Sequence, residues 1–459
     1  MKTYAVVLAA GKGTRMRTEL PKCAYPILKK PMIEYIIEHI EVSDIDETIC
    51  VVGHKKEYIE NVLKERVKYA VQEQQLGTGH AVLMAEDLLR GKEGNTIIML
   101  GDMPLVDQSV INNVLEMHTR ANNDITVLTT TFDNPYGYGR IIRDKEGRIE
   151  KIVEQNDCTP EQKMIKEINT GIYVVNNLYL FDALKQIQEN PRKKEYYLTD
   201  IISIMRNNKQ KVGAFELWDS YKVMGVNDLY SISIAEKYLR DHINKKHMLQ
   251  GVSIINPETV TIGHNVLIEG GTVIYPNTYI TGSTIIKKGS KIGPNTEVHS
   301  SKVHENVRIK HSLVFDSEIH KDSIVGPFAH LRNGAVIGED NRIGNFVEVK
   351  KSTTGKGTKA AHLAYIGDAT TGKNVNFGCG SITVNYDGVN KHQTIIGNDV
   401  FIGCNTNLVA PVSIGDKVFI AAGSTVTRDV PKGALAIARN KQINKEDYAK
   451  NFIRPKDDE

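Results

Sequence analysis

A six-residue period in the second half of the chain constrains its fold more than any other feature. Aliphatic residues recur at every sixth position in three series: Ile262, Ile268, Ile274, Ile280, Ile286, Ile292 and Val298; Ile319, Val325, Leu331, Ile337, Ile343 and Val349; and Ile396, Ile402, Leu408, Ile414, Ile420 and Val426. Neither an α-helix nor an alternating strand repeats every six residues. The period is typical of a parallel β-helix, in which each short strand and turn form one side of a coil and the aliphatic side chain points inwards.

The period fails in two places, between about residues 350 and 366 and between about 383 and 395. Insertions in a repeat fold form loops on one face, which is often the binding face. We therefore expect a loop at each break. The breaks hold His362, Tyr365, Asn385, Tyr386 and Lys391.

The first half of the chain alternates buried strand patterns with helical ones. The strand patterns are Tyr4–Leu8, Thr48–Val52, Thr96–Leu100 and Asp124–Thr129. Between the first two, Ile33, Ile36, Ile37 and Ile40 recur at helical spacing. This alternation predicts an α/β domain with a mostly parallel sheet, which binds ligands beyond the carboxyl ends of its strands. The predicted organisation is an α/β domain at 1–228, a linker helix at 229–250 and a β-helix at 251–459, with a loose tail from about 440.

Composition excludes several classes of protein. A formal net charge of +3 on 459 residues, with no basic block, gives no support for nucleic-acid binding. No apolar stretch approaches the ~20 residues that span a bilayer, so we expect no membrane insertion. The five cysteines are widely spaced and never form a Cys-x-x-Cys pair, which favours a cytoplasmic protein over a disulfide-bonded or zinc-bound one.

Two motifs at strand ends indicate phosphate and metal binding in the first half. A Gly-rich segment, Leu8–Met16, directly follows the first strand, and its backbone N–H groups suit a phosphate. It is neither a Walker A loop nor a dinucleotide fingerprint. A structural turn is the other interpretation, but the cations Arg15 and Lys22 favour a triphosphate. Asp102 ends another strand and suits Mg²⁺, although an Asp at this place also commonly caps a helix.

The motifs resemble those of sugar-1-phosphate nucleotidyltransferases, in the same order along the chain. They are Leu8–Met16, Lys22, Gln72, Leu76-Gly77-Thr78-Gly79-His80, Gly101-Asp102, Gly137-Tyr138-Gly139-Arg140, Glu154, Asn169-Thr170-Gly171 and Gly225-Val226-Asn227. With the hexapeptide β-helix attached, nearly the whole chain resembles the family of bifunctional N-acetylglucosamine-1-phosphate uridyltransferases and glucosamine-1-phosphate acetyltransferases. The resemblance implies a Rossmann-like first domain and a left-handed β-helix.

The resemblance implies a UDP-sugar site in the first domain. Its residues are Leu8, Ala9, Ala10, Gly11, Lys22, Gln72, Gly77, Thr78, Leu100, Gly101, Asp102, Gly139, Glu154, Asn169 and Asn227. Arg15 and Lys22 are the expected catalytic cations, and Asp102 and Asn227 the expected Mg²⁺ ligands. In the reaction the sugar phosphate attacks the α-phosphorus of UTP, which needs positioning and charge neutralisation rather than a nucleophilic side chain.

For the second half the resemblance implies acetyl transfer from acetyl-CoA, with His362 as the base. A single His is more often a surface or packing residue, but the polar and charged residues expected near His362 favour an active site. The expected acceptor residues are Arg332, Lys350, Tyr365 and Asn376, and the expected acetyl-CoA residues are Cys379, Asn385, Tyr386, Cys404, Ala422 and Arg439. Cys404 stands where the family usually has Ser and Cys379 where it usually has Ala. The family also implies a homotrimer formed through the β-helix.

Two other functions remain open from the sequence. The chain is alternatively a single-activity nucleotidyltransferase with a structural β-helix, or a non-catalytic subunit like the translation-factor exchange subunits that share this architecture. Joint presence of Lys22, Asp102 and Asn227 with His362, Arg332 and Lys350 favours the bifunctional enzyme.

Overall fold

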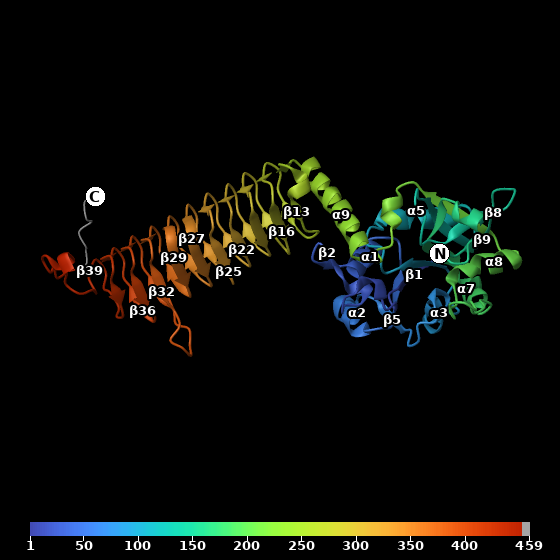
Figure 1. Cartoon of the computed structure of the whole chain (residues 1–459), viewed down its shortest axis with the longest axis horizontal. Coiled ribbons are helices and arrows are strands. Elements are labelled where there is room, and N and C mark those ends of the chain that lie inside the picture. Colours follow the sequence, from blue (N-terminus) through green and yellow to red (C-terminus); the bar gives the residue numbers. More distant parts are fainter. Residues whose placement is uncertain (452–459) are drawn as a thin grey trace, which may run out of the picture. The chain divides into compact units, whose positions relative to one another are not determined.

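The structure, a computed structural model, describes residues 1–451 and their side chains except those of Thr14 and Asn451. The chain divides into two compact units, residues 1–239 and 240–459, with the division inside helix α9 (Leu229–Leu249). That helix agrees with the helical pattern of the linker (Figure 1). The last eight residues of the expected tail, 452–459, lie outside the described part. Among residues 1–451, no helix combines the length and apolar character that crossing a membrane requires.

The first unit is built on a nine-stranded sheet with helices on both faces. The strands of this unit are β1 (Thr3–Leu8), β4 (Glu47–Val52), β5 (Lys68–Val71), β6 (Asn95–Leu100), β7 (Ile125–Thr131), β8 (Arg140–Arg143), β9 (Ile149–Val153), β10 (Glu167–Asn176) and β11 (Val212–Leu217), with a separate pair, β2 (Pro26–Ile27) and β3 (Lys30–Pro31). The helices are α1 (Met32–Glu41), α2 (Lys56–Leu63), α3 (Thr78–Leu83), α4 (Glu86–Leu89), α5 (Gln108–Arg120), α6 (Pro160–Lys163), α7 (Asn177–Leu184) and α8 (Ile201–Asn207).

The sheet is parallel through its centre and one edge, with one antiparallel strand in its main path. The main path is β11-β7-β10-β6-β1-β4-β5, and β6, β1, β4 and β5 are mutually parallel. β10, which the strand pattern did not single out, runs antiparallel to β6, β7 and β8. Successive residues of β1 belong to different cores, Val6 to one face and Val7 to the other. Burial on both faces is the reason that these strands are apolar throughout rather than alternating.

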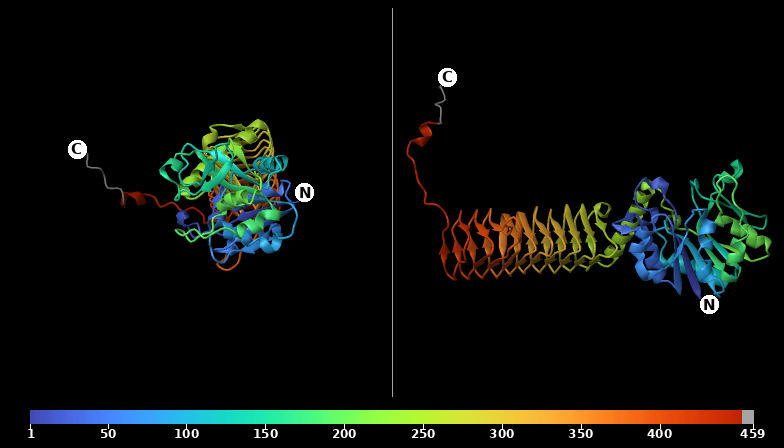
Figure 2. Two further views of the ribbon diagram at one scale, coloured as in Figure 1. Left: turned by 90° about the vertical axis from the view of Figure 1, so that its right-hand side faces the viewer. Right: turned by 90° about the horizontal axis from the view of Figure 1, so that it is seen from below.

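The second unit is a three-sided parallel β-helix whose coils stack regularly (Figure 2). Each strand pairs with the strand one coil later, as Val273 pairs with Lys291, 18 residues on. The first side contains β12 (Ser253–Ile254), β15 (Val273–Ile274), β18 (Lys291–Ile292), β21 (Arg308–Ile309), β24 (Ile324–Val325), β31 (Asn376–Phe377), β34 (Phe401–Ile402), β37 (Phe419–Ile420) and β39 (Leu435–Ala436).

Two long strands, β27 (Arg342–Lys350) and β29 (Lys359–Gly367), turn the corner from the first side to the second. The rest of the second side contains β13 (Thr261–Ile262), β16 (Thr278–Thr281), β19 (Thr296–His299), β22 (Leu313–Phe315), β25 (His330–Arg332), β32 (Ile382–Val384), β35 (Asn407–Val409) and β38 (Thr425–Val426). The third side contains β14 (Leu267–Ile268), β17 (Ile285–Ile286), β20 (Lys302–Val303), β23 (Glu318–Ile319), β26 (Val336–Ile337), β28 (Thr353–Thr354), β30 (Ala369–Thr371), β33 (Thr394–Ile396) and β36 (Val412–Ile414).

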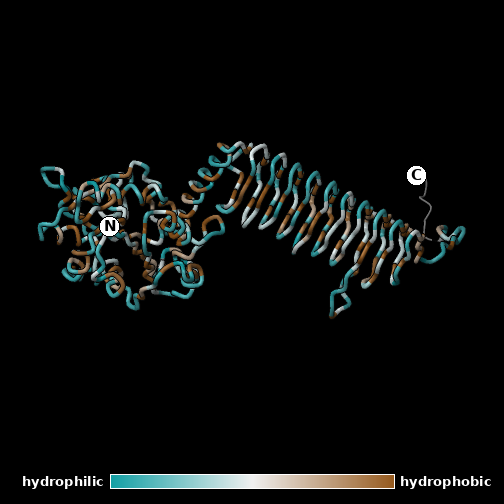
Figure 3. Tube along the Cα trace, turned by 180° about the vertical axis from the view of Figure 1, so that it is seen from behind, coloured by the Kyte–Doolittle hydropathy of each residue, from teal (hydrophilic) through white to brown (hydrophobic). Residues whose placement is uncertain are grey.

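All the aliphatic residues of the six-residue series are buried inside the coils, so the predicted β-helix is confirmed. The apparent phase slip after Val298 arises from five-residue sides, which place Val303 and Val314 inside instead. Apolar and polar stretches consequently alternate along every coil (Figure 3).

One of the two expected loops is absent. Between residues 350 and 366 the coil continues without insertion, and Thr354 and Ala360 occupy the inward positions. These residues are small or polar, which is why an aliphatic pattern missed them, and the prediction of a loop there was wrong. The second break is a loop, which leaves the coil after Val384, is bridged between Tyr386 and Lys391, and returns at Thr394 (Figures 1 and 3).

Candidate functional sites

The carboxyl ends of β1 and β6 bring the first two motifs together. Leu8 is paired with both Leu100 and Val51, and the N–H of Gly101 donates to the carbonyl of Leu8 at 2.9 Å. A Cβ atom on Gly101 would lie 2.9 Å from Ile33 Cδ1, so only glycine fits without displacing the core. The Gly-rich segment and Asp102 therefore lie at one edge of the sheet, as their strand-end positions predicted.

Four polar side chains form a charged cluster at this edge. Lys22 Nζ donates to Asp102 Oδ2 and, at 2.7 Å, to Asn227 Oδ1. Arg15 donates to the same Asn227 oxygen at 2.9 Å. The second carboxylate oxygen of Asp102, Oδ1, is buried and has no hydrogen-bond partner. An unpartnered buried carboxylate oxygen beside an amide oxygen is a donor set that suits a hard cation.

A second group gathers where β5 ends. The side-chain amide of Gln72 donates to the carbonyl of Gly77 at 3.1 Å. Thr78 Oγ1 accepts from the backbone N–H of Leu198 at 3.0 Å. Gly77 has φ of 102° and a Cβ there would lie 2.7 Å from the carbonyl of Tyr196, so glycine is required. Gln72 and Gly77 thus lie on the connection from β5 to α3, and Thr78 is the first residue of α3.

A third group surrounds a partly buried carboxyl. A Cβ on Gly139 would lie 3.6 Å from Asn169 Cβ and 3.7 Å from Glu154 Oε1, so these three expected residues are neighbours. Glu154 Oε1 accepts from the hydroxyl of Thr199 at 3.2 Å. Burial raises the pKa of Glu154, and that group therefore holds its proton more readily than an exposed Glu. Thr199 was not expected from the sequence.

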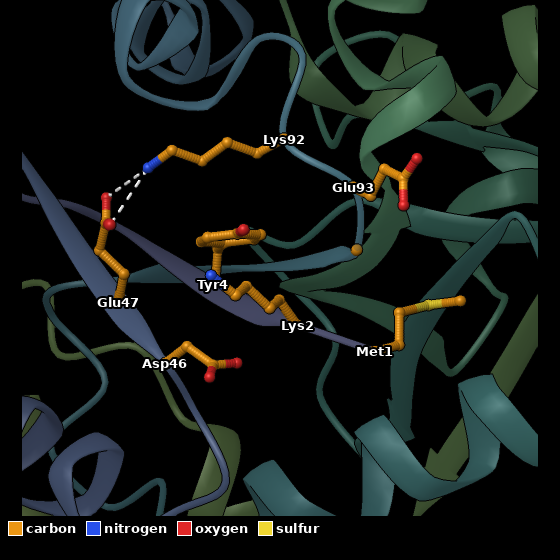
Figure 4. Close-up of a pocket in the computed structure, with 8 residues that line it drawn as sticks. Met1, Lys2, Tyr4, Asp46, Glu47, Lys92 and Glu93 are labelled. Atoms are coloured by element: carbon orange, nitrogen blue, oxygen red, sulfur yellow. Dashed lines mark hydrogen bonds and ion pairs between the residues drawn. The ribbon is translucent and has the colours of Figure 1, made fainter.

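A cavity of about 640 Å³ lies at the opposite, amino edge of the sheet (Figure 4). Lys92 reaches across it to Glu47, with Nζ–Oε distances of 3.0 and 3.1 Å. Met1, Tyr4 and Asp46 also line it. None of the predicted site residues is among its lining, so this cavity is separate from the site at the strand ends.

In the β-helix, register places the expected base and three of the expected acetyl-CoA residues in one column. Ala360, Phe377, Ile402 and Ile420 face inwards and pair on successive coils. Two residues after each of them come His362, Cys379, Cys404 and Ala422. On the two middle coils the residue between is glycine, because a Cβ on Gly378 would lie 2.5 Å from the backbone nitrogen of Cys404, and one on Gly403 equally close to that of Ala422. Both cysteines are exposed.

His362 is oriented from the preceding coil. It pairs with Asn345 in register, and its Nδ1 lies 2.8 Å from Asn345 Oδ1. Because an amide oxygen only accepts, Nδ1 carries the proton and Nε2 presents its lone pair. Asn345 was not expected from the sequence, although its spacing of one coil from His362 is the signal that reveals it.

The expected acceptor cations lie side by side, each beside a carboxylate. Arg332 pairs in register with Lys350. Arg332 donates to Glu348 Oε1 from Nε at 2.8 Å and from its terminal nitrogen at 2.6 Å. Lys350 Nζ lies 3.0 Å from Asp368 Oδ2, and both of these side chains are about nine-tenths buried. Glu348 and Asp368 each lie one coil after their partners, and neither was expected.

Tyr365 and Asn385 complete this cluster. A Cβ on Gly367 would lie 2.4 Å from the Tyr365 hydroxyl, so the ring folds over that glycine next to Lys350. The side-chain amide of Asn385 donates to Asp368 and lies 3.5 Å from the Tyr365 hydroxyl. Lys350 lowers the pKa of Lys391 because two ammonium groups lie close together, an arrangement that favours an anion between them.

Three expected residues lie outside this cluster. Asn376 pairs with Lys359 and Phe401 on the first side of the β-helix, not beside Lys350. Tyr386 is in the loop, more than half exposed, with its hydroxyl bonded to the carbonyl of Gly388 at 2.6 Å. Arg439 is exposed, and its Cδ lies 3.6 Å from the Cβ position of Gly423, immediately after Ala422.

Comparison with known proteins covers both units. Residues 4–246 match the nucleotidyl transferase family, and residues 316–351 and 393–428 match the bacterial transferase hexapeptide family of six repeats. The chain is 58% identical over 456 residues to the bifunctional protein GlmU of Acholeplasma laidlawii, with 99% of both chains covered. It is 48% identical to that of Geobacillus sp. (strain WCH70), with 98% of both covered, and 47% identical to that of Exiguobacterium sibiricum, with 98% and 100% covered. The chain therefore belongs to the family of bifunctional GlmU proteins.

Proposed function

We propose that the chain makes UDP-N-acetylglucosamine in two steps, one in each unit. Acetyl-CoA and glucosamine 1-phosphate give N-acetylglucosamine 1-phosphate and CoA, and this product reacts with UTP to give UDP-N-acetylglucosamine and pyrophosphate. The observation that carries the proposal is the coexistence in one chain of the Arg15, Lys22, Asp102 and Asn227 cluster with the His362 column. Membership of the bifunctional family agrees with it.

In the uridylyl transfer the first unit acts by positioning and charge. Gln72, Gly77 and Thr78 bind the nucleotide, and Gly139, Glu154 and Asn169 bind the sugar. Arg15 and Lys22 pair with the phosphates and stabilise the charge that develops on the leaving pyrophosphate. Both cations are already held near Asn227, so little reorganisation is needed when the substrate binds.

The same cluster fits Mg²⁺. Asp102 offers its unpartnered Oδ1, and Asn227 offers an amide oxygen. Mg²⁺ bound by these two residues would supply positive charge that offsets the charge of the triphosphate. Lys22, which donates to both residues, is placed to donate to a phosphate oxygen instead when a substrate binds.

In the acetyl transfer His362 acts as general base. Its Nε2 accepts a proton from the ammonium group of glucosamine 1-phosphate, and the free amine attacks the thioester carbonyl. As the bond from the carbonyl carbon to sulfur breaks, the attacking nitrogen loses its second proton and the CoA thiolate takes that proton up, while His362 releases the first proton to solvent. Arg332, Lys350 and Lys391 pair with the sugar phosphate, while Tyr365 and Asn385 hydrogen-bond to the sugar. CoA lies along Cys379, Cys404 and Ala422, with Tyr386 beside it and Arg439 at a CoA phosphate.

We also propose a homotrimer with the acetyltransferase site between copies. Phe328, Phe346 and Leu363 form a column of exposed apolar side chains at the corner next to His362. All three have positive φ, between 32° and 58°, a conformation that Asn and Gly adopt far more readily. Phe328 and Phe346 stack at 5.5 Å. Bulky apolar residues kept at an unfavourable, exposed corner support association there. Asn376, set apart within one chain, would then face the acceptor site of a neighbour.

The substrates and the five free cysteines support a cytoplasmic location. The test supplies purified protein with glucosamine 1-phosphate, acetyl-CoA, UTP and Mg²⁺, and follows free thiol and pyrophosphate together. Release of both, with pyrophosphate dependent on acetyl-CoA, is the expected result. Pyrophosphate only when N-acetylglucosamine 1-phosphate is supplied would leave a nucleotidyltransferase with a structural β-helix, and release of neither would leave a non-catalytic subunit.

A further inference from the structure

A cluster of two histidines and a glutamate lies on the third side of the β-helix, outside both proposed active sites. His304 and His320 follow β20 and β23, and Glu318 begins β23. Val303 and Ile319 pair in register, so the two imidazoles stack on adjacent coils with centroids 4.7 Å apart and an interplanar angle of 15°. Within residues 1–451 this is the one group of three His, Cys, Asp or Glu side chains close enough to share a metal ion.

The distances within the cluster are near those of a metal site. His304 Nε2 lies 2.7 Å from Glu318 Oε1, and His320 Nε2 lies 4.0 Å from the same oxygen. All three ligand atoms lie within 4.8 Å of one another. Ligands bound tetrahedrally at about 2.0–2.1 Å lie about 3.3 Å apart, so only small side-chain rotations are needed. Between a fifth and about a third of each side chain is exposed, which leaves room for rotation and for entry of the ion.

We propose that His304, Glu318 and His320 bind one divalent transition metal of the Zn²⁺ class. Two imidazoles and one carboxylate are typical ligands of Zn²⁺, Co²⁺ and Ni²⁺, and three protein ligands leave a position for water. Mg²⁺ prefers oxygen ligands and does not compete for this site.

The charged neighbours set the strength of the site. Lys302 Nζ lies 3.3 Å from Glu318 Oε1 and competes with a metal for that oxygen. Lys287, one coil before His304, is engaged by Glu269 at 2.7 Å, and Lys321, next to His320, by Glu339 at 3.7 Å. Lys302 is therefore the cation that a bound metal must displace.

The cluster lies on the side of the β-helix away from the proposed acetyltransferase site. The third side of a three-sided coil lies opposite the corner between the other two, and that corner carries His362. Association along the His362 corner would leave the cluster accessible to solvent. A metal held by residues of two adjacent coils links those coils, and it stabilises the folded chain in proportion to its occupancy.

The experiment uses the untagged full chain, treated with a chelator and returned to excess Mg²⁺, and titrates Co²⁺ at neutral pH. We expect one equivalent to give the visible absorption of Co²⁺ bound by imidazole, and Zn²⁺ to abolish it. The double variant His304→Gln/His320→Gln should lose at least about tenfold in affinity. Lys302→Met should bind more tightly because it removes the competing cation.

Two controls separate this site from others. His242→Gln removes an exposed His of α9 and should bind Co²⁺ as the wild type does. Retained acetyl transfer by the double variant shows that its β-helix is folded. Equal Co²⁺ affinity of the double variant and the wild type would overturn the proposal, as would the absence of any Co²⁺ absorption at millimolar metal.

Discussion

Nδ1 of His362 lies 2.8 Å from Oδ1 of Asn345, on the preceding coil of the β-helix. This contact fixes the tautomer of the proposed base, since the amide oxygen requires a proton on Nδ1 and leaves Nε2 free to accept one. Asn345 is accordingly a positioning residue for acetyl transfer.

Asn345→Ala should lower kcat for acetyl transfer by about 10- to 100-fold, because the imidazole loses both its orientation and its preferred tautomer. His362→Ala should reduce the rate further. The KM values should change little, and the pH dependence of kcat should shift. Uridylyl transfer in the same samples serves as the control, and an unchanged kcat and pH profile would contradict the role given to Asn345.

Asp102→Ala should lower the rate of uridylyl transfer by a factor of at least about 10³, because the carboxylate proposed to hold Mg²⁺ is lost. Acetyl transfer should continue at the wild-type rate. The matched control is Asp133→Ala, which removes a fully exposed carboxylate of the same unit. Equal loss of both activities in a folded Asp102 variant would show that the two sites are not independent.

Asp368→Asn should raise KM for glucosamine 1-phosphate about tenfold while kcat falls less, because Lys350 loses its buried partner. Burial raises the pKa of Asp368, but hydrogen bonds from Lys350 and Asn385 outweigh it and hold that pKa below its usual value. Wild type should therefore have the larger free energy of unfolding above about pH 4. This advantage should disappear as pH falls through the lowered pKa, and a pH-independent difference would contradict it.

Cys404→Ser should raise the rate of acetyl transfer about fivefold, as expected if a hydroxyl contributes about 1 kcal/mol more than a thiol to hydrogen bonding in the transition state. Cys379→Ala, one coil earlier in the same column, is the comparison that changes a neighbouring exposed thiol without adding a donor. Initial rates of thiol release measure both. A slower Cys404→Ser enzyme would mean that the thiol is adapted to this site.

Phe346→Asn should weaken self-association, measured by sedimentation over a range of concentrations. Asn adopts the positive φ of 58° at this corner more readily than Phe does. The free energy of unfolding of a single chain should therefore be unchanged or slightly larger in the variant. Loss of assembly and of acetyl transfer together, with uridylyl transfer retained, is the expected pattern. An oligomer as stable as that of the wild type would refute the assignment of this corner.

Local sequence patterns were sufficient to predict the fold where one residue type repeats at a fixed spacing. The inward Ile and Val residues predicted the β-helix, and the strand-end positions of Gly11 and Asp102 predicted a shared edge. The same reasoning failed at residues 350–366, because Thr354 and Ala360 fill the interior there without the aliphatic signature.

The sequence by itself determined the two folds, their order and most of the residues proposed to act, since these depend on hydrophobic period and short motifs. Only the tertiary structure decided what orients those residues. The partners Asn345, Glu348 and Asp368 are separated from His362, Arg332 and Lys350 by 16 to 18 residues, and they meet only because one coil has that length. Hydrogen bonds and ion pairs act over a few ångströms of space, whereas a motif describes only neighbours along the chain.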